Sequence, residues 1–268
     1  MGLMGATGRL GRRIVARLHD ASGVLLTGAV THASSRHMGS DIGVLAGIGS
    51  VGVRVTSQPE QIDCDVWIDV SMPEGTAELL RQTASTPVVT GVTGHGEALE
   101  EMLEQAASQR PILVASNFSV GVQFLMDAVQ QAAAALPTAA FEIVETHHRH
   151  KVDAPSGTAK TLVEAIRNGR SERITPVYGR EGQIGPRAPT AVGVHAVRGG
   201  DVVGEHRVQV LMDGELLELT HRATSRDTFA LGAIRAAVWL ASRAPGAYTM
   251  RHVIGLDGLP TTSGAEAG

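Results

Sequence analysis

Ionisable side chains are concentrated in residues 145–159, which read ETHHRHKVDAPSGTA. Histidine changes charge near neutral pH and therefore suits proton transfer, while Lys151 can pair with an anion. Ser156, Gly157 and Thr158 then begin a predicted helix, whose first N–H groups lack partners within the helix and can also receive an anion. This pattern is typical of a site that binds a carboxylate beside a proton donor.

The same segment allows other interpretations. His147, His148 and His150 provide imidazoles for a metal ion. However, Arg149 and Lys151 would repel a divalent cation, and no acidic ligand stands at a suitable spacing, so we expect no metal site. A solvated basic edge of a sheet is a further alternative, because neighbouring side chains of a strand point to opposite faces.

A glycine-rich sequence, GATGRLG at residues 5–11, leads from a predicted strand into a predicted helix over residues 9–19. Gly5 permits a tight turn, Gly8 lets the backbone approach a pyrophosphate, and Gly11 lets the helix pack closely. A glycine motif alone is a weak signal, and a flexible start is its alternative. The strand–turn–helix context nevertheless favours a dinucleotide site, because the helix N-terminus attracts phosphate.

The position that selects between NADH and NADPH follows the second predicted strand. Dinucleotide folds commonly place an acidic residue there to bind the adenine ribose, but the candidates here are Thr31 and His32. Without a carboxylate nothing repels a 2′-phosphate, and Arg36 is close in the chain. We therefore predict that NADPH serves at least as well as NADH. A solvated loop is the alternative interpretation.

Two further strand ends carry small polar residues. TGVTG at residues 90–94 follows one predicted strand, and ASNF at residues 115–118 follows another. Ligands of open α/β sheets bind beyond the carboxyl ends of the strands, so these residues suit the nicotinamide ribose and carboxamide. Ordinary turn or capping chemistry, with Asn117 or Ser119 as a helix cap, is the alternative.

The order of predicted elements indicates an α/β protein with two domains. Residues 1–115 alternate short apolar strands with amphipathic helices, as in a parallel sheet of the Rossmann type. Downstream, helices are predicted at residues 119–136 and 158–168, and strands at residues 141–146, 192–197, 203–212 and 216–221. Turns at residues 199–200 and 213–214 predict antiparallel pairing of the last three strands. We therefore expect a Rossmann-type dinucleotide-binding domain plus an α+β domain with an open mixed, mainly antiparallel sheet.

Composition argues against several classes of protein. The 268 residues carry a net charge of −4 and only 3% are aromatic, so no nucleic-acid partner is expected. No apolar run reaches the ~18 residues of a membrane helix, and no signal peptide opens the chain, so no membrane partner is expected. The single cysteine, Cys64, rules out an internal disulfide and fits a reducing, cytoplasmic location.

Five segments together resemble the 4-hydroxy-tetrahydrodipicolinate reductase (dihydrodipicolinate reductase) family. They are, in order, GATGRLG, TGVTG, ASNFSVGV, ETHHRHKVDAPSGTA and RGGDVVGEH. The resemblance covers almost the whole chain. It implies a dinucleotide-binding domain of residues 1–118 and 226–268. It also implies a substrate-binding and oligomerisation domain of residues 119–225, which builds a homotetramer through its sheet with help from residues 168–190.

The resemblance also implies a reaction. NADPH or NADH reduces 4-hydroxy-tetrahydrodipicolinate to tetrahydrodipicolinate with loss of water, in diaminopimelate and lysine biosynthesis. By motif match His147 is the proton donor, and Lys151 is a second catalytic residue that holds a substrate carboxylate. His148, Gly157 and Thr158 also bind the substrate. The residues implied to bind the cofactor are Gly5, Ala6, Thr7, Gly8, Arg9, Leu10, Gly11, Thr31, His32, Gly91, Val92, Thr93, Ala115, Ser116, Asn117 and Phe118.

Two rival functions and three departures accompany this resemblance. The rivals are another two-domain NAD(P)-dependent dehydrogenase acting on an amino or imino acid, and a nucleotide sensor without catalysis. The first strand is cut to about four residues, so we expect it to lack hydrogen-bonded partners and the native start to lie upstream. Thr31 stands where members often carry an acidic residue, and Val92 replaces a usual threonine.

Overall fold

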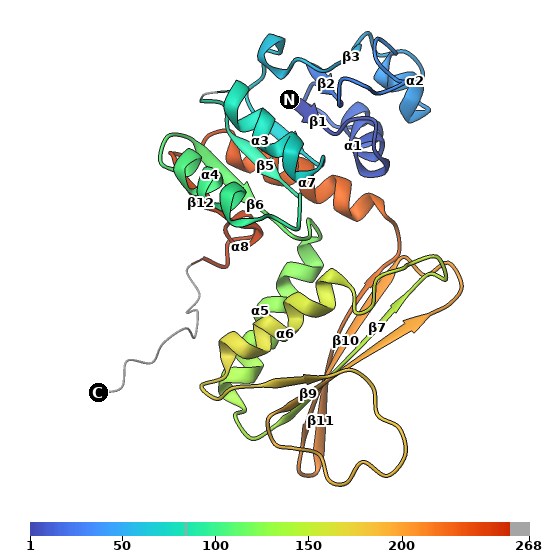
Figure 1. Cartoon of the computed structure of the whole chain (residues 1–268), viewed down its shortest axis with the longest axis vertical. Helices are drawn as coiled ribbons and strands as arrows, with labels where there is room; N and C mark the ends of the chain where they lie inside the picture. The colour runs from blue at the N-terminus through green and yellow to red at the C-terminus, as the bar shows by residue number, and fades with distance from the viewer. Residues whose placement is uncertain (84, 258–268) are drawn as a thin grey trace. The chain divides into compact units, whose positions relative to one another are not determined.

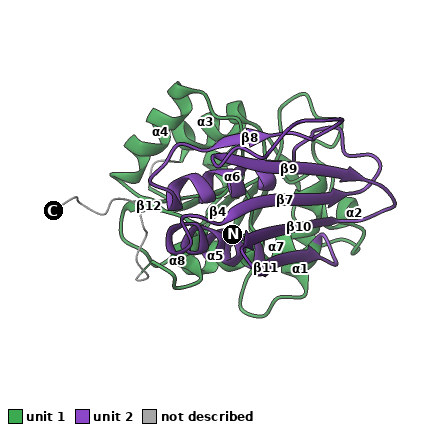
Figure 2. Cartoon of the chain, turned by 90° about the horizontal axis from the view of Figure 1, so that it is seen from below, with its two compact units in different colours: residues 1–120, 227–257 green, residues 121–226, 258–268 purple. Residues whose placement is uncertain are grey.

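The computed structural model describes residues 1–83 and 85–257 and divides them into two compact units (Figures 1 and 2). The first unit comprises Met1–Val120 and Asp227–Asp257, and the second comprises Gly121–Arg226. Each unit has its own β-sheet and its own apolar core.

The first unit contains a seven-stranded parallel sheet in the order β12-β6-β5-β4-β1-β2-β3. Its strands are β1 (Gly2–Met4), β2 (Gly28–Val30), β3 (Val55–Thr56), β4 (Trp67–Asp69), β5 (Val88–Thr90), β6 (Pro111–Val114) and β12 (Gly246–Tyr248). The order of β1 to β6 is that of dinucleotide-binding sheets, whose switch point lies between β1 and β4. The predicted Rossmann-type sheet is confirmed.

Short helices connect these strands. They are α1 (Arg9–His19), α2 (Ile42–Ala46), the 3-10 turn η1 (Pro59–Gln61), α3 (Pro73–Gln82), α4 (Glu97–Ala107), α7 (Asp227–Leu240) and α8 (Met250–Val253). Helix α1 has the bounds that its periodicity predicts, because Ile14, Val15 and Leu18 form a buried stripe along it. Helix α7 and strand β12 return the chain to the first sheet, where β12 pairs with β6 (Figure 1).

Strand β1 is central in this sheet despite its three residues. All three are buried, and they pair on one side with β2 and on the other with β4. The amino group of Met1 also donates a hydrogen bond of 2.7 Å to the carbonyl oxygen of Leu25. The expectation that this strand lacks partners is therefore wrong, because both neighbours are equally short and in matching register.

The second unit contains a five-stranded sheet in the order β11-β10-β7-β9-β8 (Figure 2). Its strands are β7 (Ala140–His147), β8 (Thr175–Val177), β9 (Ala191–Arg198), β10 (Gly204–Met212) and β11 (Glu215–Ala223). Helices α5 (Val120–Ala135) and α6 (Gly157–Gly169) pack their apolar sides on one face of this sheet. The predicted open mixed sheet is confirmed, with antiparallel pairings at β10–β11 and β10–β7 and parallel pairings at β7–β9 and β8–β9.

One predicted pairing in this unit is wrong. The turn at residues 213–214 does join an antiparallel hairpin, β10–β11. The turn at residues 199–200 does not, because β7 lies between β9 and β10 and pairs with both. The central position of β7 is a long-range pairing that turn residues alone do not reveal.

Alternation along β7 divides its side chains between the two faces. Phe141, Ile143, Glu145 and His147 are buried on the face that the helices cover. Glu142 and its alternating neighbours are half-buried on the uncovered face. The strand therefore delivers two ionisable groups into the helix-covered side at its carboxyl end.

The segment of residues 168–190 is attached to the uncovered face through Glu142. Arg180 donates to both carboxylate oxygens of Glu142 at 2.8 and 2.9 Å, and Arg187 and His195 add contacts of 3.4 and 2.9 Å. Burial raises the pKa of Glu142, but these hydrogen bonds and the charge of Arg180 outweigh it and bring the pKa to about 2. A Cβ on Gly193 would lie 1.7 Å from the Glu142 carboxylate, so only glycine leaves room for this cluster.

Helices in residues 1–83 and 85–257 are all too short or too polar to cross a lipid bilayer.

Candidate active site

The proton donor expected at residue 147 is paired with a buried carboxylate. His147 ends β7, and its Nδ1 lies 2.5 Å from Oε2 of Glu145, which is two residues earlier on the same face. Glu145 is fully buried, and His147 is 9% exposed. Because the carboxylate occupies Nδ1, the second ring nitrogen, Nε2, is the one that can carry a transferable proton.

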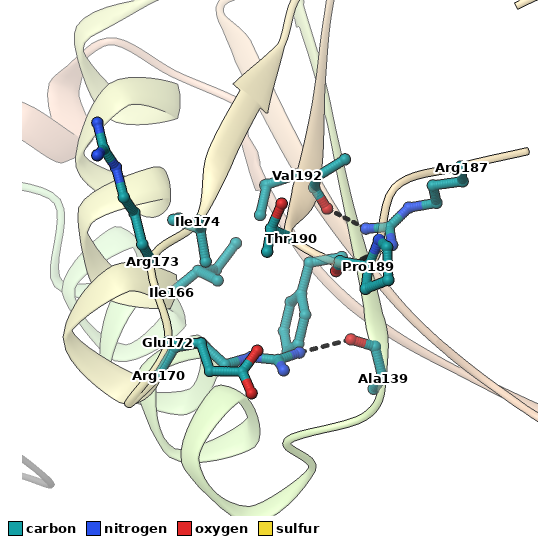
Figure 3. Close-up of a pocket in the computed structure, with 12 residues that line it drawn as sticks. Ala139, Ile166, Arg170, Glu172, Arg173, Ile174, Arg187, Pro189, Thr190 and Val192 are labelled. Carbon is teal, nitrogen blue, oxygen red and sulfur yellow. Dashed lines mark hydrogen bonds between the residues drawn. The ribbon is translucent and has the colours of Figure 1, made fainter.

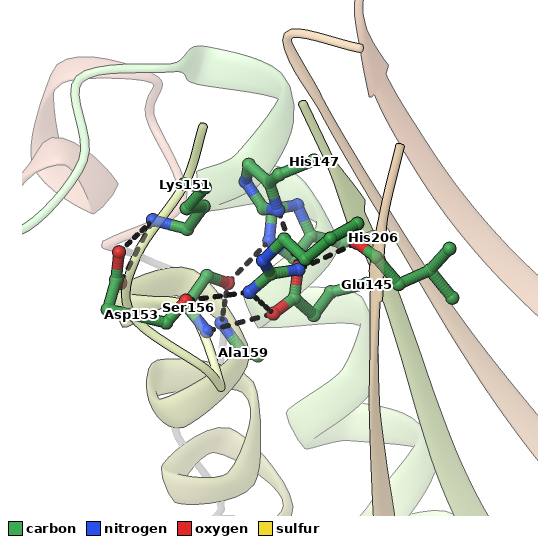
Figure 4. A network of polar contacts seen from close by, with 9 residues as sticks. Glu145, His147, Lys151, Asp153, Ser156, Ala159 and His206 are labelled. Atoms are coloured by element: carbon green, nitrogen blue, oxygen red, sulfur yellow. Dashed lines mark hydrogen bonds and ion pairs between the residues drawn. The ribbon is translucent and has the colours of Figure 1, made fainter. Parts of the chain in front are cut away.

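Glu145 is held as an anion by three donors (Figure 4). Arg198, at the end of β9, donates to both carboxylate oxygens at 2.7 and 2.8 Å. The backbone N–H of Ser156 donates to Oε1 at 3.0 Å. Burial raises the pKa of Glu145, but the hydrogen bonds from Arg198, His147 and Ser156 outweigh it and keep the pKa below the usual 4.5.

Burial is also the largest influence on His147, and it lowers the pKa of this histidine below the usual 6.5. The hydrogen bond to Glu145 acts in the opposite direction, while the charges of Lys151 and Arg198 lower the pKa further. A lowered pKa makes the protonated ring a stronger acid. The bound substrate, if it is anionic, raises this pKa again.

The start of helix α6 lies beside this pair. Ser156 is the N-cap and accepts a hydrogen bond of 3.2 Å from the backbone N–H of Ala159. Gly157 is exposed, and a Cβ there would meet nothing within 4 Å. The first turn of a 13-residue helix thus faces open space next to the proton donor, as anion binding requires.

Lys151 is not the isolated cation that the sequence suggests. Its Nζ lies 2.7 and 2.9 Å from the two carboxylate oxygens of Asp153, and the ammonium lowers the pKa of Asp153. The Asp153 side chain is 53% exposed, so the pair is worth at most about 1 kcal/mol. A substrate carboxylate can therefore share or replace this partner. Sequence analysis missed it because the short loop folds back on itself.

His148 is the first residue after β7, which ends at His147. Its backbone N–H donates to the carbonyl oxygen of Val202 at 2.8 Å. Its buried Nδ1 has no hydrogen-bond partner among the described residues. Desolvation lowers the pKa of His148, and the electrostatic effects of Arg226, His150, Lys151 and Arg198 lower it further. His147, His148 and Lys151 thus share one end of the sheet but have different surroundings.

The glycine-rich loop forms the floor of a cavity of ≈ 520 Å³ in the first unit. Gly5 has φ +79°, and a Cβ on it would lie 2.7 Å from the carbonyl of Val70, so the turn needs glycine. Gly8 is the N-cap of α1 and provides no side-chain cap, which leaves the first N–H groups of this helix to a ligand. The volume and the uncapped helix fit a dinucleotide.

Only part of the predicted cofactor set lines this cavity. The predicted residues that do so are Gly5, Thr7, Gly8, Thr31 and His32. Ala6 and Gly11 are buried beneath the loop, while Arg9 is exposed and Leu10 half-buried on α1. Strand β5 is followed by Gly91, Val92 and Thr93, and strand β6 is followed by Ala115, Ser116, Asn117 and Phe118. Parallel pairing brings these ends to the same sheet edge as Gly5, and the ring of Phe118 packs where a Cβ on Gly91 would stand.

A buried aspartate that sequence analysis missed organises this edge. Asp69, the last residue of β4, is fully buried and accepts hydrogen bonds from the hydroxyls of Ser71 (2.5 Å), Thr76 (2.6 Å) and Thr90 (3.1 Å). Burial raises the pKa of Asp69, and these donors oppose the rise. Ser71 lines the cofactor cavity, so Asp69 ties β4, β5 and α3 together behind it.

A second cavity, at the far end of α6, does not fit a substrate. It is lined by the end of α6 and the start of β9, with Arg170 and Arg187 at its rim (Figure 3). Both guanidinium groups donate to backbone carbonyls, of Ala139 and Ala191. Its volume of ≈ 20 Å³ is about that of one water molecule. No group of three or more metal-binding side chains occurs in the described part of the chain.

Fold and site together define a two-domain oxidoreductase that uses a nicotinamide dinucleotide. Family models described as "Dihydrodipicolinate reductase, N-terminus" and "Dihydrodipicolinate reductase, C-terminus" match residues 1–118 and 121–254. The chain belongs to the dihydrodipicolinate reductase family.

Relatives in this family are similar over nearly the whole chain. The 4-hydroxy-tetrahydrodipicolinate reductase of Acinetobacter baumannii is 44% identical over 264 residues, with 96% of each chain covered. That of Magnetococcus marinus is 45% identical and covers 95% of this chain and 98% of its own. A dipicolinate-bound dihydrodipicolinate reductase from Paenisporosarcina sp. TG-14 has the same fold, with a TM-score of 0.71, 22% identity, and coverage of 92% of this chain and 96% of its own.

Proposed function

We propose that this chain reduces 4-hydroxy-tetrahydrodipicolinate to tetrahydrodipicolinate with NADPH or NADH, in diaminopimelate and lysine biosynthesis. Each turnover adds one hydride and one proton to the ring and releases one water. The observation that carries the proposal is the buried Glu145–His147 pair beside the open start of α6. Similarity to the reductases of the family supports the choice of substrate.

The substrate carries two carboxylates and needs donors for both. We assign one carboxylate to the start of α6, through Gly157 and Thr158, and to Lys151. His148 supplies a further donor once its buried Nδ1 carries a proton. Glu145 and Asp153 are the nearest anions, but Arg198 and Lys151 already neutralise them. Both anions are therefore already paired and repel a dianion less, and the substrate carboxylates meet the N–H groups at the start of α6 and protonated His147.

Proton delivery is assigned to His147. The reduced nicotinamide, when bound, supplies the hydride. Addition of hydride leaves negative charge on a neighbouring ring carbon, and the Nε2–H bond of protonated His147 breaks as that carbon takes the proton. Glu145 stabilises the ring while it is an imidazolium and keeps Nδ1 protonated after the transfer.

The test of this function is the loss of NADPH absorbance with substrate made by the preceding synthase reaction. We expect turnover by the wild-type protein and a rise of about 10²-fold in the substrate KM of Lys151→Ala, because a cationic partner of a carboxylate is lost. Turnover of an amino or imino acid instead of the cyclic substrate would favour the rival dehydrogenase. Binding of NADPH without any turnover would favour the sensor.

Cofactor choice follows from the charges after β2. Residues 31–40 contain no Asp or Glu. Arg12 and Arg36 both lie 3.3 Å from Nε2 of His37, which therefore accepts and carries no proton there. Arg12 also donates to the carbonyl oxygen of Thr7, which lines the cofactor cavity, and this supports binding of a 2′-phosphate there.

Substitution His32→Glu is therefore expected to lower kcat/KM for NADPH by about tenfold and to change that for NADH less than threefold. A carboxylate at the rim repels the 2′-phosphate, whereas NADH has none. His32→Gln is the matched neutral control and should keep the wild-type ratio. A wild-type preference for NADH of more than about tenfold would contradict the proposed phosphate site.

We further propose that a second copy of the chain covers the uncovered face of the second sheet, within a homotetramer. This face carries a row of exposed apolar side chains: Leu211 and Leu216, which are register partners, are 37% and 51% exposed. Arg207 and His195 flank Val144 on it. Exposed apolar rows of this kind mark interfaces.

Val144→Arg is expected to convert the tetramer to smaller species, because it buries a second cation beside Arg207 in the interface. Light scattering should give four times the chain mass of 28.0 kDa for the wild type and a lower mass for the variant. Leu231→Arg, at an exposed leucine of α7, is the control and should keep the wild-type mass. A monomeric wild-type protein would refute the interface.

We assign the protein to the cytoplasm, a reducing compartment that agrees with its single, unpaired cysteine.

A further inference from the structure

His206 is buried beside the proposed site, yet the reaction described above makes no use of it. It lies on β10, is 4% exposed, and its Nε2 lies 3.1 Å from Oγ of Ser156. Its ring meets that of His147 edge-on, with ring centres 5.2 Å apart and planes at 74° (Figure 4). His206 therefore contacts both the proposed proton donor and the N-cap of the helix proposed to bind the substrate.

We propose that His206 is a positioning residue that acts through His147 and Ser156. Its ring fixes the plane of the His147 imidazole, and its Nε2 holds the Ser156 hydroxyl at the start of α6. One side chain thus fixes the position of the proton donor relative to the helix turn that binds the carboxylate. This inference rests on the proposed function, because it assigns His147 and α6 the roles given there.

Packing alone does not explain a histidine at this position. The Nδ1 atom of His206 is buried and has no hydrogen-bond partner among the described residues. A buried polar atom without a partner lowers stability, so a phenylalanine would be favoured if only volume mattered. The ring nitrogen that does bind, Nε2, contacts the N-cap serine. The histidine therefore combines a ring contact and a hydrogen bond that no apolar residue provides.

The charge state of His206 suits this role. Burial and then the charge of His147 lower the pKa of His206, Glu145 acts in the opposite direction, and the pKa is about 4. His221 and Lys151 are the other charged or titratable groups that face it, and both lower the pKa. His206 is thus neutral at neutral pH. It places no second cation beside the His147 ring when that ring is protonated.

Three variants separate these contributions. His206→Ala removes the ring and the hydrogen bond, whereas His206→Phe keeps a ring against His147 but removes the bond to Ser156. His221→Phe is the matched control, because His221 is the cross-strand partner of His206 on β11 and has no role in the proposed site. Circular dichroism and thermal unfolding first define a temperature at which every variant is folded.

The first readout is the pKa of His147 in the ligand-free protein, measured by NMR with labelled imidazole carbons. In His206→Ala, water reaches the His147 ring, so we expect its pKa to rise by about half a unit or more. His206→Phe and the control should leave it unchanged. This readout needs no turnover, so it tests the positioning role even if the proposed reaction fails.

The second readout is the split between kcat and substrate affinity. His206→Ala is expected to lower kcat by about tenfold, since small displacements of an acid–base group reduce rates strongly. His206→Phe should mainly weaken binding of dipicolinate, a stable aromatic dicarboxylate used as the probe, by about threefold to tenfold. If His206→Ala does not fold, the comparison of kcat with dipicolinate affinity in His206→Phe tests the proposal by itself. Unchanged His147 pKa, kcat and dipicolinate affinity in the folded variants would overturn the proposal.

Discussion

Replacement of His147 by glutamine is expected to lower kcat by at least about 10²-fold and to leave the KM for NADPH unchanged. Glutamine keeps the approximate volume and its amide N–H can still bond to Glu145, but an amide is too weak an acid to transfer that proton. The matched control is His195→Gln, because His195 also pairs with a glutamate, Glu142, on the opposite face of the same sheet. Steady-state kinetics should show less than about a twofold change in this control.

The pH dependence of the wild-type enzyme provides an independent check of the same assignment. A general acid acts only when protonated, so kcat/KM should fall as the pH rises through the pKa of His147 in the free enzyme. Burial lowers that pKa, so the fall should begin below pH 6.5. The dianionic substrate raises the pKa in the complex, so kcat should fall at higher pH than kcat/KM. Coincident profiles, or a fall retained by His147→Gln, would remove the assignment.

Glu145→Gln is expected to reduce both stability and turnover. The substitution leaves the guanidinium of Arg198 without its carboxylate in a largely buried place, so we expect a loss of about 2–3 kcal/mol of unfolding free energy at pH 7. It also removes the anion that orients and stabilises the His147 imidazolium, so kcat should fall by about 10²-fold. Chemical denaturation and steady-state kinetics measure the two effects.

The pH dependence of this stability loss shows whether the charge of Glu145 or its packing volume causes the loss. The pKa of Glu145 is lowered in the folded protein, so its stabilising contribution is complete above the usual value of 4.5 and is lost as the pH falls below it. The difference in stability between wild type and Glu145→Gln should therefore shrink in acid. Glu142→Gln, on the same strand but the other face, should cost stability without moving the pH profile of kcat/KM. A constant difference down to pH 3 would exclude the ionic explanation.

Local signals in the sequence predict the first unit well. The bounds of α1 follow from its apolar spacing, and the turn at Gly5 follows from the only residue type that fits a positive φ against Val70. The parallel sheet follows from the alternation of strands and helices. These features depend on residues that are close in sequence, so their patterns are visible before folding.

The candidate site was predictable only where its residues share one strand or loop. His147, His148 and Lys151 stand in a single segment, and alternation by two places Glu145 on the face of His147. Arg198 and His206 reach the same site from β9 and β10, which flank β7 in the sheet. Their strand order depends on packing across the whole second unit, and the turn at residues 199–200 points to the wrong pairing. Local sequence patterns therefore cannot predict site residues that come from distant strands, such as Arg198 and His206.

Because α7 and β12 return to the first sheet, the two units are completed at different times during synthesis. Residues 121–226 form one uninterrupted segment, whereas the sheet that holds the glycine loop needs chain from both sides of it. On the ribosome the inserted unit can finish its core first, while the outer unit waits with an open edge at β6 until its final strand emerges. Deletion of β12 would therefore damage the nucleotide-binding half of the molecule, although this strand lies more than two hundred residues from the glycine loop.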